Sequence, residues 1–226
     1  MILILALALL AHGNFATSQQ PSQAGGGTVE GVVVDPDNKP IKDASVYADN
    51  LSLPSAARPH TALTDAQGHF VVDGVLPGHI VMRAFKEADK YPMISGTFDE
   101  PIGEKTNPEL EMKVGDDFKG IVIRLGPKAG FLRFRVVDAN TNEPIKGITF
   151  QMCRGDHPSD RRYCMFGSAR GDSTWFVPAF APISVNVSAP NYGDWSYRDM
   201  AAKSPYIALA PGEDRTLTMK LQASPH

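Results

Sequence analysis

The sequence is poor in the features that direct a chain to nucleic acid or into a membrane. Its net charge is only −3, with 22 Lys and Arg against 25 Asp and Glu, so no strong field attracts a nucleic acid. Beyond residues 2–11, no stretch is long and apolar enough to span a bilayer. We therefore expect a chain that neither binds nucleic acid nor spans a membrane.

Residues that carry catalysis or hold metals are also scarce. No Gly-x-Ser-x-Gly nucleophile elbow occurs. The six histidines lie in turns, strand starts, loops or chain ends rather than beside a Ser or Cys nucleophile. We predict no catalytic residues, no metal site and no cofactor.

The apolar run at residues 2–11 is too short for a membrane span and has the length of a signal-peptide core. Small residues around Ser18 predict cleavage between Ser18 and Gln19, although no Lys or Arg precedes the run. No cysteine follows that would carry a lipid anchor. We predict a signal peptide over 1–18, a flexible lead over 19–27 and an exported protein, periplasmic or extracellular.

Only two cysteines occur, Cys153 and Cys164, and they flank a polar loop over 154–163. In an exported chain such a pair favours a disulfide, which would stabilise the fold by about 3 kcal/mol in the chain-entropy model. Free thiols and a metal site are the alternatives. The Cys-x10-Cys spacing, with His157 as the nearest extra donor, is not a zinc spacing.

Elsewhere apolar residues alternate with a period of two and are interrupted by Gly and Pro corners. The clearest example is residues 64–84, where a tight turn and two strands follow one another. Asp65 can accept a hydrogen bond from the backbone two residues on, and Gly68 tolerates a positive φ. This periodicity predicts strands and no helix.

These residues resemble a known motif, which runs Thr-Asp-x-x-Gly-x-Phe and continues into a Leu-Pro corner. The matching residues here are Thr64, Asp65, Gly68, Phe70, Leu76, Pro77 and Gly78. Upstream, residues 31–35, 39–41 and 44–46 match as well. The pattern resembles the carboxypeptidase regulatory-like domain, a seven-stranded β-sandwich related to the transthyretin fold. The resemblance implies a mostly non-catalytic accessory module over 28–127.

The second half of the chain repeats the first. Residues 131–138 correspond to the first strand, and residues 142–147 mirror the turn that follows it. The copy diverges at the middle hairpin, where Leu76 becomes Ala181. The predicted fold is therefore all-β, with two tandem seven-stranded antiparallel Greek-key β-sandwiches over 28–127 and 128–226.

The two halves differ in charge. Residues 28–127 carry 10 Lys and Arg against 16 Asp and Glu, whereas residues 128–226 carry 12 against 9. The net charges of −6 and +3 would help the halves dock on each other. Two independently solvated surfaces are the alternative.

Related sandwich folds include enzymes, but the residues that those enzymes need are missing. The chain has no His-x-His pair for the iron of intradiol dioxygenases and no His-x-x-Glu for the zinc of the carboxypeptidases. Hydroxyisourate hydrolases end in Tyr-Arg-Gly-Ser, whereas this sequence ends in Ala-Ser-Pro-His. We therefore expect that the protein is not an enzyme.

The strongest candidate for ligand binding is the aromatic stretch over 191–198. Aromatic rings there alternate with amide and charged groups, a mixture that can stack on sugar rings and hydrogen-bond their hydroxyls. The predicted ligand-binding residues are Asn191, Tyr192, Asp194, Trp195 and Tyr197. In the alternative, Tyr192 and Trp195 fold back over the sandwich as caps of its core.

Two further patterns are commonplace turn or surface sequences. Arg-Gly-Asp occurs at 154–156 and 170–172, and Asn50 and Asn186 begin formal glycosylation sequons. The sequence as a whole predicts an exported non-catalytic binding or structural module, with a polysaccharide or an envelope protein as partner. A carbohydrate-binding protein using residues 191–198 and a hydrolase with a site between the domains are the alternatives.

Overall fold

The computed structural model describes residues 25–54, 59–93, 98, 107–169, 172–198, 200 and 203–224. The predicted signal peptide and most of the predicted lead lie outside the described residues. The described chain consists of strands and two single-turn 3-10 helices, η1 (Glu87–Asp89) and η3 (Arg161–Tyr163). Within these residues no helix is long and apolar enough to cross a membrane.

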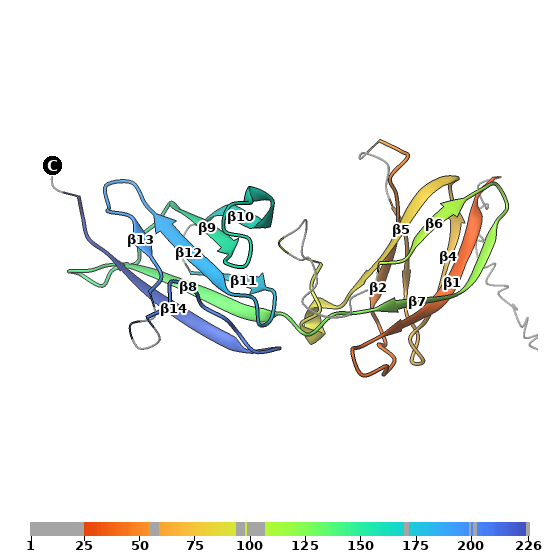
Figure 1. The fold of residues 1–226 in the computed structure, drawn as a ribbon, viewed down its shortest axis with the longest axis horizontal. Helices are drawn as coiled ribbons and strands as arrows, with labels where there is room; N and C mark the ends of the chain where they lie inside the picture. The colour runs from red at the N-terminus through yellow and green to blue at the C-terminus, as the bar shows by residue number, and fades with distance from the viewer. Residues whose placement is uncertain are drawn as a thin grey trace, which may run out of the picture.

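The N-terminal domain is a sandwich of two sheets (Figure 1). One sheet has the order β4-β1-β7 and the other has the order β3-β2-β5-β6. Its strands are β1 (Gly27–Val34), β2 (Ser45–Asn50), β3 (His60–Leu63), β4 (His69–Val75), β5 (Gly78–Phe85), β6 (Glu109–Met112) and β7 (Asp117–Arg124).

The C-terminal domain has the same topology. Its sheets have the orders β11-β8-β14 and β10-β9-β12-β13, so that each strand number is that of the first domain plus seven. Its strands are β8 (Gly130–Asp138), β9 (Ile148–Arg154), β10 (Cys164–Ala169), β11 (Ser173–Val177), β12 (Ile183–Ser188), β13 (Trp195–Ser196) and β14 (Asp214–Leu221). The predicted tandem all-β sandwich fold is confirmed.

Two pairings depart from the antiparallel expectation. β1 pairs with β7 in parallel, and β8 pairs with β14 in parallel. In each domain the last strand joins the first only after the chain has built the opposite sheet. A parallel neighbour requires such a long crossover, whereas the short hairpins give antiparallel pairs.

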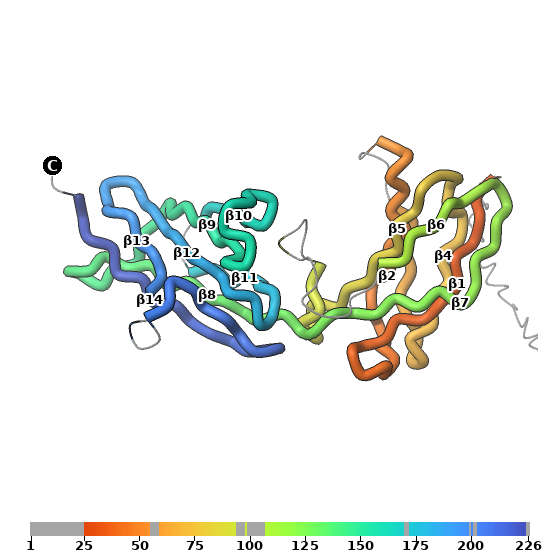
Figure 2. The backbone as a smooth tube through the Cα atoms, viewed as in Figure 1, coloured from red at the N-terminus to blue at the C-terminus, as the bar shows by residue number. Residues whose placement is uncertain are grey.

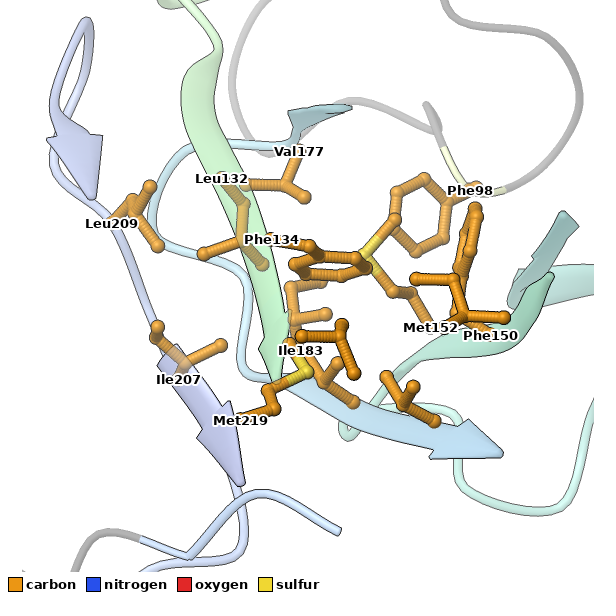
Figure 3. Packing of buried hydrophobic residues seen from close by; sticks show 14 of the residues in the cluster. Phe98, Leu132, Phe134, Phe150, Met152, Val177, Ile183, Ile207, Leu209 and Met219 are labelled. Atoms are coloured by element: carbon orange, nitrogen blue, oxygen red, sulfur yellow. The ribbon is translucent and has the colours of Figure 1, made fainter. Parts of the chain in front are cut away.

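Two separate hydrophobic cores lie between the sheets, one in each domain. The period-two pattern places them, because β1 buries every second residue and turns the others outward. In the first core the largest fully buried side chains include Phe70, Ile80 and Met82. In the second they include Phe134, Met152 and Met219 (Figure 3).

The hairpin at residues 64–84 forms as its turn residues predict. The Asp65 carboxylate accepts hydrogen bonds from the backbone N–H groups of Gln67 and His69, both at 2.9 Å. Gly68 has a φ of 72°, and a Cβ there would lie 2.6 Å from the carbonyl oxygen of Val33. Glycine is therefore required at this position for both its backbone conformation and its size.

Thr64 is one of the few buried polar residues in the described chain, with 3% of its surface exposed. Its Oγ1 donates to the Ile41 carbonyl at 2.6 Å and accepts from the Ala44 N–H at 2.8 Å. The hydroxyl thereby fixes the segment before β2 against the start of the hairpin.

The chain passes directly from β7 into β8, where the two domains meet (Figure 2). Lys90 follows η1 in the left-handed conformation and reaches across this junction. Its ammonium donates to the Gly212 carbonyl at 2.7 Å and to the Asp214 carboxylate at 2.9 Å. The same ammonium lies 4.5 Å from the centroid of the Phe131 ring, and the Lys90 carbonyl accepts from the Ala129 N–H at 2.8 Å.

Phe98 makes the second contact between the domains. It belongs to the connection between β5 and β6 of the N-terminal domain, yet it is 2% exposed within the core of the C-terminal domain. Figure 3 shows its ring beside Met152 and Phe150. The C-terminal core is thus completed by a side chain from outside strands β8–β14.

We predict that Thr64→Ala lowers the free energy of unfolding of the N-terminal domain by about 1–3 kcal/mol, because a buried N–H and a carbonyl lose their partner. Urea unfolding followed by far-ultraviolet circular dichroism measures this loss. Both tryptophans of the chain, Trp175 and Trp195, lie in the C-terminal domain, so tryptophan emission reports the unfolding of that domain separately.

The matched control is Thr61→Ala, which removes an exposed threonine from the neighbouring strand β3. We expect it to change the free energy of unfolding by no more than about 0.5 kcal/mol. Equal losses for the two variants would contradict the role assigned to the Thr64 hydroxyl.

Candidate ligand-binding face

The predicted ligand-binding residues around 191–198 do not act as one group. β13 pairs with β12 so that Trp195 lies opposite Val187, which is buried. Trp195 therefore lies on the core side of the sheet, half-buried against the hydrophobic cluster. Tyr192 also packs against this cluster, and its hydroxyl donates to the Asp138 carboxylate at 3.1 Å.

The hydrogen bond between Tyr192 and Asp138 accompanies opposite pKa shifts. The pKa of Asp138 lies below its ordinary value, because the N–H groups of Thr141 and Asn140 and the Tyr192 hydroxyl all bond its carboxylate. Desolvation and the neighbouring carboxylate raise the pKa of Tyr192. These two residues therefore have structural partners, in agreement with the core-cap alternative.

Of the other three predicted residues, Asn191 and Asp194 are exposed, whereas Tyr197 packs against the same hydrophobic cluster as Trp195. Asn191 is exposed and adopts a φ of 68° at a turn, a conformation that asparagine tolerates better than most residues. Asp194 is exposed and Tyr197 is half-buried, and each lines a groove on the outer side of the sheet. The Trp195 and Tyr197 rings meet edge to face, with centroids 6.4 Å apart.

The outer side of sheet β10-β9-β12-β13 presents small uncharged polar side chains, a surface that we call the polar face. Strand pairing aligns them in rows across the sheet, because residues directly opposite one another share a side. The polar face consists of Thr149, Gln151, Ser168, Ser184, Asn186, Ser188 and Ser196, together with the aromatic Phe166 at its border.

Hydrogen bonds between neighbouring strands fix several of these side chains. The hydroxyls of Thr149 and Ser188 lie 2.7 Å apart, and the Ser196 hydroxyl donates to Asn186 Oδ1 at 2.7 Å. Among the described residues, the Asn186 amide nitrogen has no hydrogen-bond partner. It remains a donor on the surface.

Two adjacent grooves of about 590 and 400 Å³ run along the polar face and share Asn186 and Ser196. The larger one extends over Tyr197 to Arg198 and Lys203. The smaller one is bordered by Phe166, which is 52% exposed. The Arg161 guanidinium lies 5.3 Å from the centroid of the Phe166 ring.

Cys153 and Cys164 form the predicted disulfide. They lie opposite each other on the paired strands β9 and β10. The Gln151 amide nitrogen donates to Cys153 Sγ at 3.0 Å. The disulfide therefore joins the two strands at one end of the polar face.

In the first Arg-Gly-Asp triplet the arginine and aspartate side chains bond to each other. Arg154 is 5% exposed and pairs with the Asp156 carboxylate through two hydrogen bonds of 3.0 and 2.6 Å. The guanidinium also lies over the Tyr163 ring, which stacks on His157. A buried arginine is not available to an adhesion receptor, which supports the turn interpretation. In the second triplet, positions 170 and 171 lie outside the described residues.

Asn50 also has a structural role. Its amide nitrogen donates to the carbonyls of Leu76 and Pro77, both at 3.0 Å, and its Oδ1 accepts from the Ser52 N–H. The side chain thereby holds the corner between β4 and β5.

The equivalent outer side of sheet β3-β2-β5-β6 in the N-terminal domain is different. Charged side chains there pair with one another, as Arg83 does with Asp49 at 3.1 Å. His79 lies 2.7 Å from Glu111 and 3.3 Å from Glu109. Within the part of the chain that the structure describes, no three His, Cys, Asp or Glu residues form a group that could hold a metal ion.

The polar face was not predicted from the sequence. Serine, threonine and asparagine at alternate positions of a strand are what any solvent-facing side of a sheet requires. Only the pairing of four strands shows that these residues align next to Arg198 and Lys203. The aromatic stretch over 191–198 was the feature that the sequence indicated, and it forms the edge of this surface rather than its centre.

Residues 28–99 match the family model of the carboxypeptidase regulatory-like domain. The predicted family of the N-terminal domain is thereby confirmed, whereas the match does not extend to the C-terminal domain. A search of curated proteins found no match.

Solved structures with similarity to the chain include bacterial pilins. The minor pilin GBS52 of Streptococcus agalactiae is 12% identical over 88% of this chain and 97% of its own, with a TM-score of 0.35. The major pilin BcpA of Bacillus cereus is 9% identical over 88% of this chain and 99% of its own, with a TM-score of 0.28.

The TIE protein of Bacillus anthracis is 12% identical over 88% of this chain, with a TM-score of 0.32. The chain spans only 34% of that protein, and 63% of a streptococcal ancillary pilin. Identities and TM-scores this low carry no conclusion about function.

We predict that the C-terminal domain loses stability in acid through Asp156. Its pKa lies below the ordinary value because the Arg154 guanidinium hydrogen-bonds the carboxylate. A pKa that is lower in the folded state stabilises the fold above the unfolded value of about 3.9, and this contribution disappears as the pH falls through the lowered folded pKa.

Asp156→Asn should therefore lower the free energy of unfolding at pH 7 and flatten its decline below about pH 4. Urea unfolding followed by tryptophan emission at several pH values measures both effects. The control is Glu143→Gln, which changes an exposed carboxylate without an ion pair among the described residues. An unchanged acid profile in Asp156→Asn would refute the assignment.

Proposed function

We propose that this chain, whose residues 28–99 match the carboxypeptidase regulatory-like domain, is an exported, non-catalytic structural and binding module of the cell envelope or extracellular space. The observation that carries the proposal is the insertion of Phe98 into the second core. Two domains joined through a shared core form a spacer of defined shape rather than two tethered units.

The contact at Lys90 supports the same interpretation. Its ammonium satisfies one carbonyl and one carboxylate of the C-terminal domain and lies over an aromatic ring of that domain. These bonds are directional, so they fix the angle between the domains, while the buried Phe98 ring resists their separation. A structural module that holds its two ends in a fixed arrangement requires both contacts.

Export is supported by the disulfide and by the predicted signal peptide. Disulfides persist in oxidising compartments and are rare in the reducing cytosol. A periplasmic or extracellular location of the mature chain follows. The family resemblance of residues 28–99 to an accessory domain agrees with a chain that supports other molecules and performs no reaction itself.

A carbohydrate-binding role is the second candidate, favoured by the polar face and its two grooves. Hydroxyl and amide groups fixed on a rigid sheet beside aromatic rings suit sugar hydroxyls and ring faces. Of the predicted residues, Asp194 and Tyr197 line these grooves. No observation among the described residues favours the hydrolase alternative.

We predict that Phe98→Ala lowers the free energy of unfolding of the C-terminal domain by about 3–5 kcal/mol, because it leaves a cavity in a well-packed core. Tryptophan emission during urea unfolding measures the loss in that domain. Small-angle X-ray scattering should show a broader distribution of interdomain distances, because the domains lose their buried contact.

The matched control is Met93→Ala, an apolar truncation in the same connection at a position that is 52% exposed. It should leave both measurements unchanged. Lys90→Met provides a variant that keeps the core intact, and it should broaden the scattering distribution with little loss of C-terminal stability. Unchanged scattering in both Phe98→Ala and Lys90→Met would refute the rigid spacer.

A further inference from the structure

The residues around the polar face carry more positive than negative charge. Of the described residues that line the two grooves, Arg198 and Lys203 are cationic and Asp194 carries a carboxylate. Neither cation has an ion pair among the described residues. Arg161, over the Phe166 ring, adds a third positive charge at the opposite border.

This arrangement contrasts with the equivalent side of the N-terminal domain. There the Arg83 and His79 side chains lie beside carboxylates on neighbouring strands. Two sheets with the same strand order thus differ in whether their cations have partners. Residues 128–226 as a whole carry a net charge of +3, so the surrounding field also favours an anion.

The shape of the face favours a chain that lies flat on it. Small residues such as Ser184, Asn186 and Ser188 line the grooves at its centre. Phe166 is exposed at one border, and the half-buried Tyr197 lines the groove at the other. The rows of polar groups cross strands that are spaced about 4.8 Å apart. A ligand lying across the strands therefore meets a hydrogen-bonding group at each strand and an aromatic ring at either side.

The backbone of the face argues against a peptide ligand. An extended peptide usually adds to a free sheet edge, where it bonds unpaired N–H and C=O groups. The centre of this face lies on the strands β9 and β12, which are paired on both sides. Recognition must come from side-chain hydroxyls and amides, which match the dense hydroxyls of a saccharide.

We infer that the polar face binds an acidic polysaccharide, a chain of uronic acid units. The hydroxyl and amide groups of Thr149, Asn186 and Ser196 bond the sugar hydroxyls, and Arg198 and Lys203 bind the sugar carboxylates. Phe166 and Tyr197 provide apolar surfaces for the ring faces. The inference deepens the binding role in the proposed function and rests on its placement of the protein in the envelope or outside the cell.

The test is calorimetric titration of the purified mature chain with an oligogalacturonate of six or more units. Cellohexaose serves as the neutral saccharide and hexaglutamate as the acidic peptide. We expect the oligogalacturonate to bind, with an affinity that falls as salt is added, and to bind at least tenfold more tightly than either comparison ligand.

The double variant Arg198→Ala/Lys203→Ala should weaken oligogalacturonate binding at least tenfold. Its control is Arg133→Ala/Arg135→Ala, which removes two exposed charges from β8 in the opposite sheet and should change affinity less than twofold. Asn186→Ala, which keeps both cations, should weaken binding as well. Circular dichroism and tryptophan emission establish that each variant is folded.

Three outcomes would overturn the inference. They are no binding of oligogalacturonate, equal affinity for hexaglutamate, and equal losses in the two double variants. The second outcome would indicate a site for acidic peptides, and the third would indicate unspecific attraction by charge. Because these titrations do not depend on the angle between the domains, their failure is distinguishable from failure of the rigid spacer, which scattering tests.

Discussion

The burial of Phe98 in a core that belongs to other strands is the contact on which the rest of the structure depends. A core is closely packed, so a ring of that size cannot be withdrawn without leaving a cavity or forcing its neighbours to collapse. Strands β8–β14 therefore require the N-terminal domain to complete their interior. The chain has two sandwiches by topology but one continuous mechanical unit by packing.

The same core lies directly beneath the polar face. Phe150 turns inward and packs against Phe134 and Trp175, at ring centroid distances of 5.5 and 4.5 Å, while its chain neighbours Thr149 and Gln151 turn outward. Gly167 leaves room for this ring, because a Cβ there would lie 2.4 Å from it. Figure 3 shows Phe98 next to Phe150. The interdomain contact and the face thus share a supporting residue.

Much of the fold follows from local sequence. Asp65 and Gly68 specify a turn by their own chemistry, and alternation specifies which residues of β1 are buried. The burial of Phe98 could not be predicted in this way, because a single aromatic residue in a connection without periodicity does not indicate which core it enters. Trp195 was equally ambiguous, since a residue just after a loop can turn to either side of a sheet. The parallel pairing of β1 with β7 depends on strand order, which alternation does not encode.

A comparison of the two domains explains why sequence motifs did not predict the candidate site. In the N-terminal domain Thr64 is buried and hydrogen-bonded on both sides, so few residues can replace it. Side chains on the outer side of a sheet have no such constraint. One copy covers its outer side with paired charges, whereas the other presents hydroxyls and amides beside cations that lack carboxylate partners among the described residues. The two domains share their topology, and their side chains differ on the outer side of the sheet, which packing leaves free.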